Sequence, residues 1–302
     1  MPDPLFLVAP GRSYTSLIGG MLGQHPEIYG MPELNVSQAE TIGEILQTLR
    51  GPLEFGLAGL LRLLAELHEG AQTEETVLRA REWLAERAHW SVKRLLDHVQ
   101  EHVGDKILFD KSPLTVMRPE NMPRLLDMYP HASFLHLTRH PITTGKSAMS
   151  LRADIQANRT GGDAQMQTRR NLDPEMSWLR GNTHITDFTS TLPVGQSLRV
   201  KAELLLSDPQ KYLAQICDWL GVSTSADALE AMMHPENSPY ACLGPPSALY
   251  GNDPNFLKNP VLDMSRLQNI KEPDLEMVVP WREDGSTLKP ETIKLARQFG
   301  YG

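Results

Sequence analysis

Residues 10–16 carry the groups that proteins use to bind a phosphate or a sulfate. They read Pro-Gly-Arg-Ser-Tyr-Thr-Ser and join an expected strand to an expected helix. Arg12 supplies a permanent charge with a planar fork of donors, and Gly11 permits an unusual turn. Hydroxyl groups at the start of the helix, where free backbone N–H groups favour an anion, come from Ser13, Thr15 and Ser16. A plain strand-to-helix turn with serine and threonine caps is the alternative interpretation.

Two more cations occupy similar positions later in the chain. Lys111 and Arg139 each come directly after a short apolar run, and Ser147 lies eight residues beyond Arg139. Because the carboxyl ends of parallel strands meet at one edge of a sheet, we expect these cations to gather there with Arg12. In a chain of net charge −8, such a cluster predicts an anion site, in which Arg139 and Ser147 could hold a second phosphate.

The elements that must position these residues alternate between strand and helix. Short apolar runs predict buried strands at residues 5–9, 106–110 and 132–138, with a weaker candidate at residues 197–201. Helical patterns lie between them, which predicts an α/β fold with a parallel sheet flanked by helices. The pattern is helical throughout residues 41–103. We interpret this block as a helical insertion over the active-site edge of a single domain that spans residues 1–302.

Composition excludes several classes of protein. The acidic balance argues against a protein that coats nucleic acid. The two cysteines, Cys217 and Cys242, lie far from any second cysteine or histidine at metal-ligand spacing, so no zinc site is expected. No apolar run is long enough to span a bilayer, and the first residues lack the features of a signal peptide. We therefore expect a cytoplasmic protein that does not associate with membranes.

Taken together, the motifs resemble the sulfotransferase family that uses 3′-phosphoadenosine-5′-phosphosulfate (PAPS). Members carry a Gly-Arg-Ser-x-Thr-Ser loop after the first strand, and later an apolar strand, Arg-x-Pro, and a serine eight residues after that arginine. The resemblance implies a P-loop nucleotide-kinase-like fold and PAPS as donor, with no metal. It assigns the 3′-phosphate to Arg139 and Ser147. It assigns the 5′-phosphosulfate to Gly11, Arg12, Ser13, Tyr14, Thr15 and Ser16. Family members often read Arg-Tyr-Glu where residues 201–203 read Lys-Ala-Glu, so the aromatic residue that could contact adenine is absent here.

The expected reaction is an in-line displacement at sulfur by an acceptor oxygen. Arg12 and Lys111 are the candidates to stabilise charge on the leaving group. Phenol and steroid sulfotransferases carry a histidine base just after the matching lysine, but this chain has Ser112 there. By similarity to protein-tyrosine sulfotransferases, Glu33 is the candidate general base. His234 is a second candidate, as a base or as a ligand of the substrate.

The Pro- and Gly-rich segment at residues 234–262 is predicted to be a lid, with Lys258 directed at the 3′-phosphate. Within it, residues 252–257 resemble the sulfotransferase domains of polyketide synthases that make terminal alkenes. Those domains sulfate the β-hydroxyl of a carrier-bound acyl chain, so the resemblance implies an acyl carrier protein as partner. A phenolic, peptidyl or sugar hydroxyl remains open as acceptor. So do a nucleotide kinase-like enzyme and a non-catalytic module that binds adenosine bisphosphate.

Overall fold

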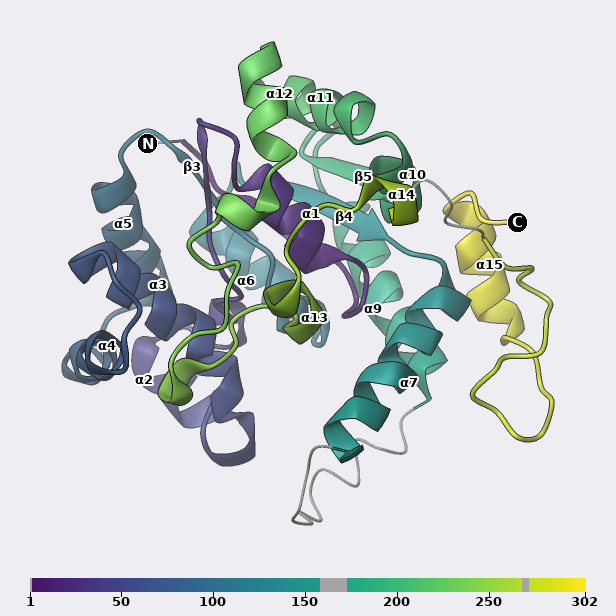
Figure 1. The fold of residues 1–302 in the computed structure, drawn as a ribbon, viewed down its shortest axis with the longest axis horizontal. Helices are drawn as coiled ribbons and strands as arrows, with labels where there is room; N and C mark the ends of the chain where they lie inside the picture. Colours follow the sequence, from purple (N-terminus) through teal and green to yellow (C-terminus); the bar gives the residue numbers. More distant parts are fainter. Residues whose placement is uncertain (1, 158–172, 268–271) are drawn as a thin grey trace.

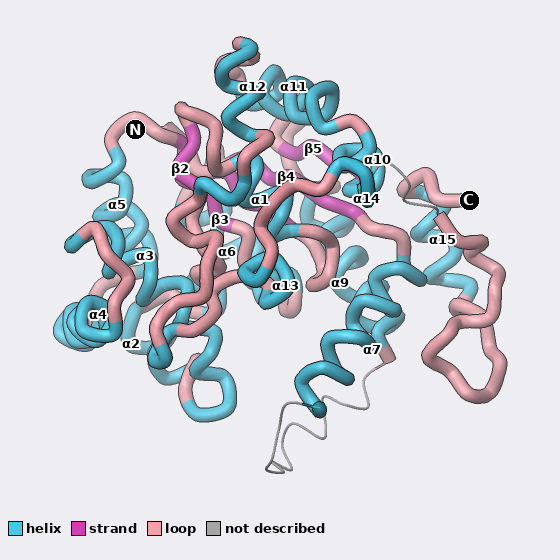
Figure 2. Tube along the Cα trace, in the orientation of Figure 1, coloured by secondary structure: helices cyan, strands magenta, loops and turns pink. Residues whose placement is uncertain are grey.

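A five-stranded parallel sheet forms the centre of the computed structural model, which describes residues 2–157, 173–267 and 272–302 (Figures 1 and 2). The strands lie in the order β2-β3-β1-β4-β5. Their bounds are β1 Leu5–Val8, β2 Ile28–Gly30, β3 Ile107–Asp110, β4 Ser133–Thr138 and β5 Ser197–Lys201. Leu5 pairs with Phe109 of β3 on one side and with Ser133 of β4 on the other. The ends of these three central strands therefore meet at one edge.

Helices cover both faces of the sheet because its strands alternate between two apolar layers. Leu5 and Leu7 of β1 face one layer, and Phe6 and Val8 face the other. The first layer contains α1 Thr15–Leu22, α10 Ala202–Ser207, α11 Pro209–Leu220 and α12 Ala226–Met232. The second contains α6 Asn121–Met128 and α9 Pro174–Thr189. The predicted α/β class, a P-loop nucleotide-kinase-like sheet flanked by helices, is confirmed.

Four helices occupy the segment between β2 and β3 that was predicted as an insertion. They are α2 Ile42–Thr48, α3 Ala58–Glu69, α4 Glu74–Glu86 and α5 Val92–Val103. Side-chain oxygens of Thr41, Thr73 and Ser91 cap three of them, and Gly70 ends α3 in a left-handed conformation. Their apolar faces pack on one another in a separate core, at the left of Figure 1. We call these helices the helical insertion.

The C-terminal part of the chain crosses the sheet edge and then packs beside it. Helix α7 Pro141–Ala157 follows β4, and the helices that follow α12 are α13 Pro254–Lys258, α14 Met264–Leu267 and α15 Pro290–Gln298. In Figure 1, α13 lies below α1, and α15 lies at the right, where it contacts α9. Among the described residues, no helix combines the length and the apolar character that crossing a bilayer requires.

Candidate active site

The loop after β1 has an unusual backbone, but not where the sequence placed it. Arg12 and Tyr14 adopt left-handed conformations, with φ of 72° and 61°, whereas Gly11 does not. The expectation of an unusual turn at Gly11 is therefore wrong, because the left-handed residues are Arg12 and Tyr14, which have side chains. Such conformations cost about 1–3 kcal/mol each and concentrate at functional sites. Among the described residues, no side chain caps α1, so the first backbone N–H groups of this helix have no side-chain acceptor.

Ser13 is the residue of this loop that most clearly lacks a partner. Its side chain is fully buried, and its hydroxyl oxygen finds no hydrogen-bond partner among the residues that the structure describes. Leaving such a group unpaired costs about 1–3 kcal/mol. The buried hydroxyl and the uncapped helix start are the features that a bound phosphate or sulfate would satisfy. The loop therefore fits the phosphosulfate that the sequence resemblance implies.

Three cations lie at the ends of three adjacent strands. Arg12 follows β1, Lys111 follows β3, and Arg139 follows β4. Lys111 is only 3% exposed, because its side chain crosses α1 at Gly19, where an added Cβ would overlap it. Burial lowers the pKa of Lys111, and the negative charges of Glu33 and Asp110 oppose that shift. The topology thus brings together cations that are about 130 residues apart in sequence.

Arg12 also links the two expected phosphate positions. Its Nε donates to the Ser147 hydroxyl of α7 at 3.1 Å, and its carbonyl oxygen accepts from Arg139 at 2.6 Å. The guanidinium of Arg139 lies 4.0 Å from the centre of the Tyr14 ring, close enough for a cation–π contact. The residues assigned to the 5′- and the 3′-phosphate are therefore joined in one network.

The segment predicted as a lid contacts two of these cations directly. The Asp253 carboxylate forms an ion pair with Arg12, and the Asn252 side-chain oxygen accepts from Lys111. The Asp253 N–H donates to the Ser16 hydroxyl at 3.0 Å. A carboxylate of the protein's own chain thus neutralises the arginine of the phosphate loop.

A cavity of about 290 Å³ lies between the loop after β1, α7 and this segment. Its lining includes Arg12, Thr15, Ser16, Arg139, Ser147 and, from the later segment, Asp253, Asn255, Phe256 and Asn259. This one cavity is therefore lined by most of the residues that were assigned to the donor from the sequence. The volume is near the lower end of the range typical of ligand pockets.

Glu33 lies beside the cations Lys111 and Arg12, and backbone contacts hold it there. Its N–H donates to the Gly251 carbonyl at 2.7 Å, and its backbone packs against Gly59 of α3, where an added Cβ would overlap it. Burial raises the pKa of Glu33 from 4.5 to about 7, although the positive charges of Lys111 and Arg12 oppose the shift. A carboxylate with that pKa is half ionised near neutral pH and is suited to accept a proton.

Two residues at the end of β3 position Glu33, and the sequence did not assign them this role. The buried Asp110 carboxylate accepts from the Leu34 N–H at 3.3 Å and from the Ser112 hydroxyl at 2.8 Å. The Ser112 oxygen in turn accepts from the Asn35 N–H at 2.7 Å. These bonds fix the chain directly after Glu33. The sequence singled out their neighbour Lys111, but only the structure identifies the partners of Asp110 and Ser112.

His234 and Lys258 lie apart from this cluster. His234 is exposed and contacts Glu236 at 3.0 Å and Glu230 at 3.4 Å, and these hydrogen bonds raise its pKa. A raised pKa leaves a smaller fraction of the imidazole unprotonated, and therefore able to accept a proton, at a given pH. Lys258 is exposed at the end of α13, and among the described residues it does not line the cavity beside Arg12. The roles assigned to both residues stay predictions.

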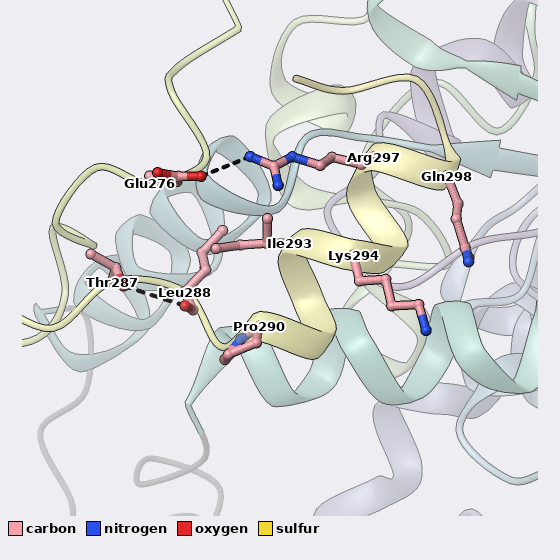
Figure 3. Close-up of a pocket in the computed structure, with 8 residues that line it drawn as sticks. All are labelled: Glu276, Thr287, Leu288, Pro290, Ile293, Lys294, Arg297 and Gln298. Atoms are coloured by element: carbon pink, nitrogen blue, oxygen red, sulfur yellow. Dashed lines mark hydrogen bonds and ion pairs between the residues drawn. The ribbon is translucent and has the colours of Figure 1, made fainter.

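A second hollow lies beside α15, and its lining differs from that of the cavity beside Arg12 (Figure 3). Leu288, Pro290 and Ile293 form its apolar part, and Arg297 pairs with Glu276 across one side at 2.7 Å. None of the residues that the sequence predicted for the site lines this hollow, as far as the structure describes it. The chemistry of interest therefore lies at the sheet edge.

A family model described as the sulfotransferase family matches residues 4–226. The chain belongs to the sulfotransferase family. This confirms the resemblance that the motifs at Arg12 and Arg139 carried. Among curated proteins, none matches this sulfotransferase significantly.

Two solved structures share the fold of this sulfotransferase over its whole length. The sulfotransferase domain from the curacin biosynthetic pathway is 24% identical with a TM-score of 0.78, and covers 100% of this chain and 99% of its own. The sulfotransferase domain from the Synechococcus PCC 7002 olefin synthase is 26% identical with a TM-score of 0.74, and covers 100% and 97%. Residues 252–257 resemble sulfotransferase domains that act in making terminal alkenes, and a sulfotransferase domain of an olefin synthase matches over the whole chain.

Proposed function

We propose that this sulfotransferase moves a sulfuryl group from PAPS to an acceptor hydroxyl. The observation that carries the proposal is the meeting of Arg12, Lys111 and Glu33 at the ends of β1 and β3, beside an uncapped helix start. Two cations and a carboxylate with a pKa of about 7 are the groups that transfer to an oxygen nucleophile requires. The buried Ser13 hydroxyl, which has no partner among the described residues, further supports a bound anion.

PAPS, when bound, supplies a sulfuryl group whose transfer leaves adenosine 3′,5′-bisphosphate. In this proposal Arg12 and Lys111 neutralise the negative charge that grows on the oxygen of the leaving phosphate. The Glu33 carboxylate takes the proton of the acceptor hydroxyl as that oxygen attacks sulfur. Arg139 and Ser147 hold the 3′-phosphate. Asp253 must release Arg12 before the anion binds, because both compete for the same guanidinium.

The acceptor that we propose is the β-hydroxyl of an acyl chain bound to a carrier protein. Residues 252–257 provide the sequence resemblance, and the olefin synthase domain provides a whole-length relative at 26% identity. A sulfate is a far better leaving group than a hydroxide, so sulfation prepares a β-hydroxyacyl chain for elimination to an alkene. The product named for that relative, an olefin, agrees with such a sequence of reactions.

The test has two parts, so that donor and acceptor are judged separately. Adenosine 3′,5′-bisphosphate is titrated by calorimetry into wild type and Arg139→Ala. We expect tight binding to wild type and much weaker binding to the variant, because Arg139 is assigned to the 3′-phosphate. An absence of binding to wild type would exclude PAPS as donor. Unchanged binding to the variant would show that the 3′-phosphate lies elsewhere.

The second part measures transfer. PAPS is incubated with a β-hydroxyacyl carrier protein, the same chain on free pantetheine, and a phenol, and sulfation is followed by mass spectrometry. We expect the carrier-bound substrate to be preferred, and Glu33→Gln to be inactive on it. Preference for the phenol would contradict the acceptor proposal while leaving the donor in place. Binding without transfer to any acceptor would favour a non-catalytic module, and phosphoryl transfer from ATP would favour a kinase.

A further inference from the structure

Three histidines of the helical insertion form a compact group. His68 lies near the end of α3, and His98 and His102 lie on α5. The ring centres are 5.2 Å apart for His68 and His98, 4.4 Å for His98 and His102, and 5.7 Å for His68 and His102. Each ring can direct one nitrogen at a common point, because the three nitrogens all lie within 4.8 Å of one another. The group is separate from the cavity that contains Arg12.

The spacing on α5 already suits a shared ligand. His98 and His102 are four residues apart, which places them on one face of the helix, at a spacing common in zinc sites. The Nδ1 of His102 bonds to the His98 carbonyl oxygen at 2.8 Å. This bond makes Nδ1 the protonated nitrogen, and leaves the Nε2 lone pair for another partner. Second-shell bonds of this kind orient histidines that bind metals.

His68 and His98 already share a bond at the point where an ion would lie. Their Nε2 atoms are 2.9 Å apart, so one nitrogen donates its proton to the lone pair of the other. Trp83 of α4 supports both rings, since it stacks on His98 at 4.9 Å and lies 5.1 Å from His68. His68 and His102 are exposed, so an ion could enter from solvent.

The charged groups around the histidines are paired with one another. Glu69 pairs with Arg79, and Glu101 pairs with Arg94. The cation Arg87, which acts electrostatically on His68, pairs with Glu86. The ligand atoms that the geometry offers are three imidazole nitrogens, which suit zinc, copper, nickel and cobalt better than magnesium or calcium.

We propose that His68, His98 and His102 bind a divalent transition-metal ion, with zinc as the expected ion. Bond lengths of about 2.0–2.1 Å place ligand nitrogens about 3.3 Å apart in a tetrahedral site. The exposed rings reach that spacing by rotating their side chains. The ring that donates in the His68–His98 bond gives up its Nε2 proton and takes one on Nδ1. The ion ties α3 to α5 and keeps a fourth position for water.

The test uses full-length protein purified without a histidine tag, stripped with a chelator and dialysed. Zinc chloride alone is titrated by calorimetry. We expect one ion per chain with a dissociation constant in the micromolar range or tighter, and a rise in the melting temperature, since an ion that binds only the folded chain stabilises it. Cobalt(II) should give the visible absorption of a tetrahedral site.

Variants at the exposed positions separate ligation from folding. His68→Gln and His102→Gln should each weaken zinc binding about 100-fold and remove the cobalt absorption, because each loses one of three ligands. His89→Gln, an exposed histidine between α4 and α5, is the matched control and should bind as wild type does. Millimolar binding, several ions per chain, or unchanged binding in either ligand variant would each overturn the proposal. Equal weakening in the control would do the same.

Discussion

At the scale of single residues, the environment of Glu33 determines its chemistry. Burial raises its pKa to about 7, and the nearby Lys111 and Arg12 keep the shift from being larger. An ordinary surface glutamate would be fully ionised at neutral pH but too weak a base to take a proton from a hydroxyl. The combination of burial with two adjacent cations therefore distinguishes Glu33 from the exposed His234, the other predicted base.

The pH dependence of transfer should report Glu33. Below pH 7 the carboxyl is protonated and cannot accept a proton, so kcat/KM should rise about tenfold per pH unit and then level off above about pH 7. Glu33→Gln should lose about 10²–10⁴ in kcat and show no such rise. His234→Ala is the comparison, and its profile should match wild type. If the rise of kcat/KM with pH disappeared in His234→Ala instead, His234 would be the base.

The Asp253 carboxylate acts on the same site by competing for Arg12. Asp253→Asn keeps the cap on α13, because asparagine also accepts from the Asn255 N–H, but it removes the charge that pairs with Arg12. We expect adenosine 3′,5′-bisphosphate to bind about tenfold more tightly, or about 1.4 kcal/mol. Calorimetry on Asp253→Asn and on Asp284→Asn, which makes the same charge change far along the chain, measures the difference. Weaker binding in Asp253→Asn would mean that its carboxylate assists the ligand.

At the scale of elements, the end of β3 and the start of α3 together position Glu33. Asp110 and Ser112 bond to the chain just after it, and Gly59 lets that chain pack directly on the helix. A hydrogen-bonded carboxylate on one side and a missing side chain on the other leave Glu33 little freedom. The helical insertion therefore contributes to the site through its backbone as well as through its apolar core.

Gly59→Ala tests this packing. The added Cβ overlaps the backbone of Glu33, which cannot rotate away as a side chain could, so the loop must shift. We expect a loss of about 1–3 kcal/mol in the free energy of unfolding, as for other overpacked sites, and at least a tenfold fall in kcat. Urea denaturation and the transfer assay measure the two effects. Wild-type activity in a variant that is destabilised would show that Glu33 tolerates the movement.

The sequence predicted four of the five strands, three of them from continuous apolar runs and the fourth, at residues 197–201, from a weaker pattern. The predicted strands at residues 5–9, 106–110, 132–138 and 197–201 correspond to β1, β3, β4 and β5. It missed β2 at Ile28–Gly30, a three-residue edge strand that contains tyrosine and glycine and has too few residues to show a period. The left-handed backbone at Arg12 and Tyr14 was also missed, because neither residue type favours it.

The site itself could be predicted only in part. Arg12, Lys111 and Arg139 could be grouped because each follows a strand of a parallel sheet, and the rule for strand ends is general. The pairing of Asp253 with Arg12, like the grouping of His68 with His98 and His102, depends on how distant loops and helices pack. Sequence spacing contains no signal for such contacts.

At the scale of the whole molecule, the C-terminal segment supports the helix that carries Ser147. Trp281 packs on Gly145 of α7, where an added Cβ would overlap its ring. Arg282 pairs with Asp173 and with Glu175 at the start of α9, and Glu175 is fully buried. Residues near the end of the chain therefore hold α7 against α9.

Removing one partner of this buried pair should be strongly destabilising. Arg282→Ala leaves the Glu175 charge buried without its guanidinium, so we expect a loss of about 3–5 kcal/mol in the free energy of unfolding. Arg297→Ala breaks the exposed pair with Glu276 in the same region and should cost less than about 1 kcal/mol. Urea denaturation of both variants provides the comparison. Equal losses in the free energy of unfolding would show that burial does not increase the contribution of the Arg282 pair to stability.

The ion pair between Asp253 and Arg12 has a consequence for selectivity. A small anion such as inorganic phosphate gains one guanidinium when it enters the loop, but it must first break the pair that the protein already makes. By the proposed assignment, a nucleotide with two separate phosphate groups would also gain Arg139 and Ser147, and this second attachment would offset the lost pair. If the donor binds as proposed, the internal carboxylate would favour ligands with two anchors over ligands with one, and inorganic phosphate would compete poorly for the site.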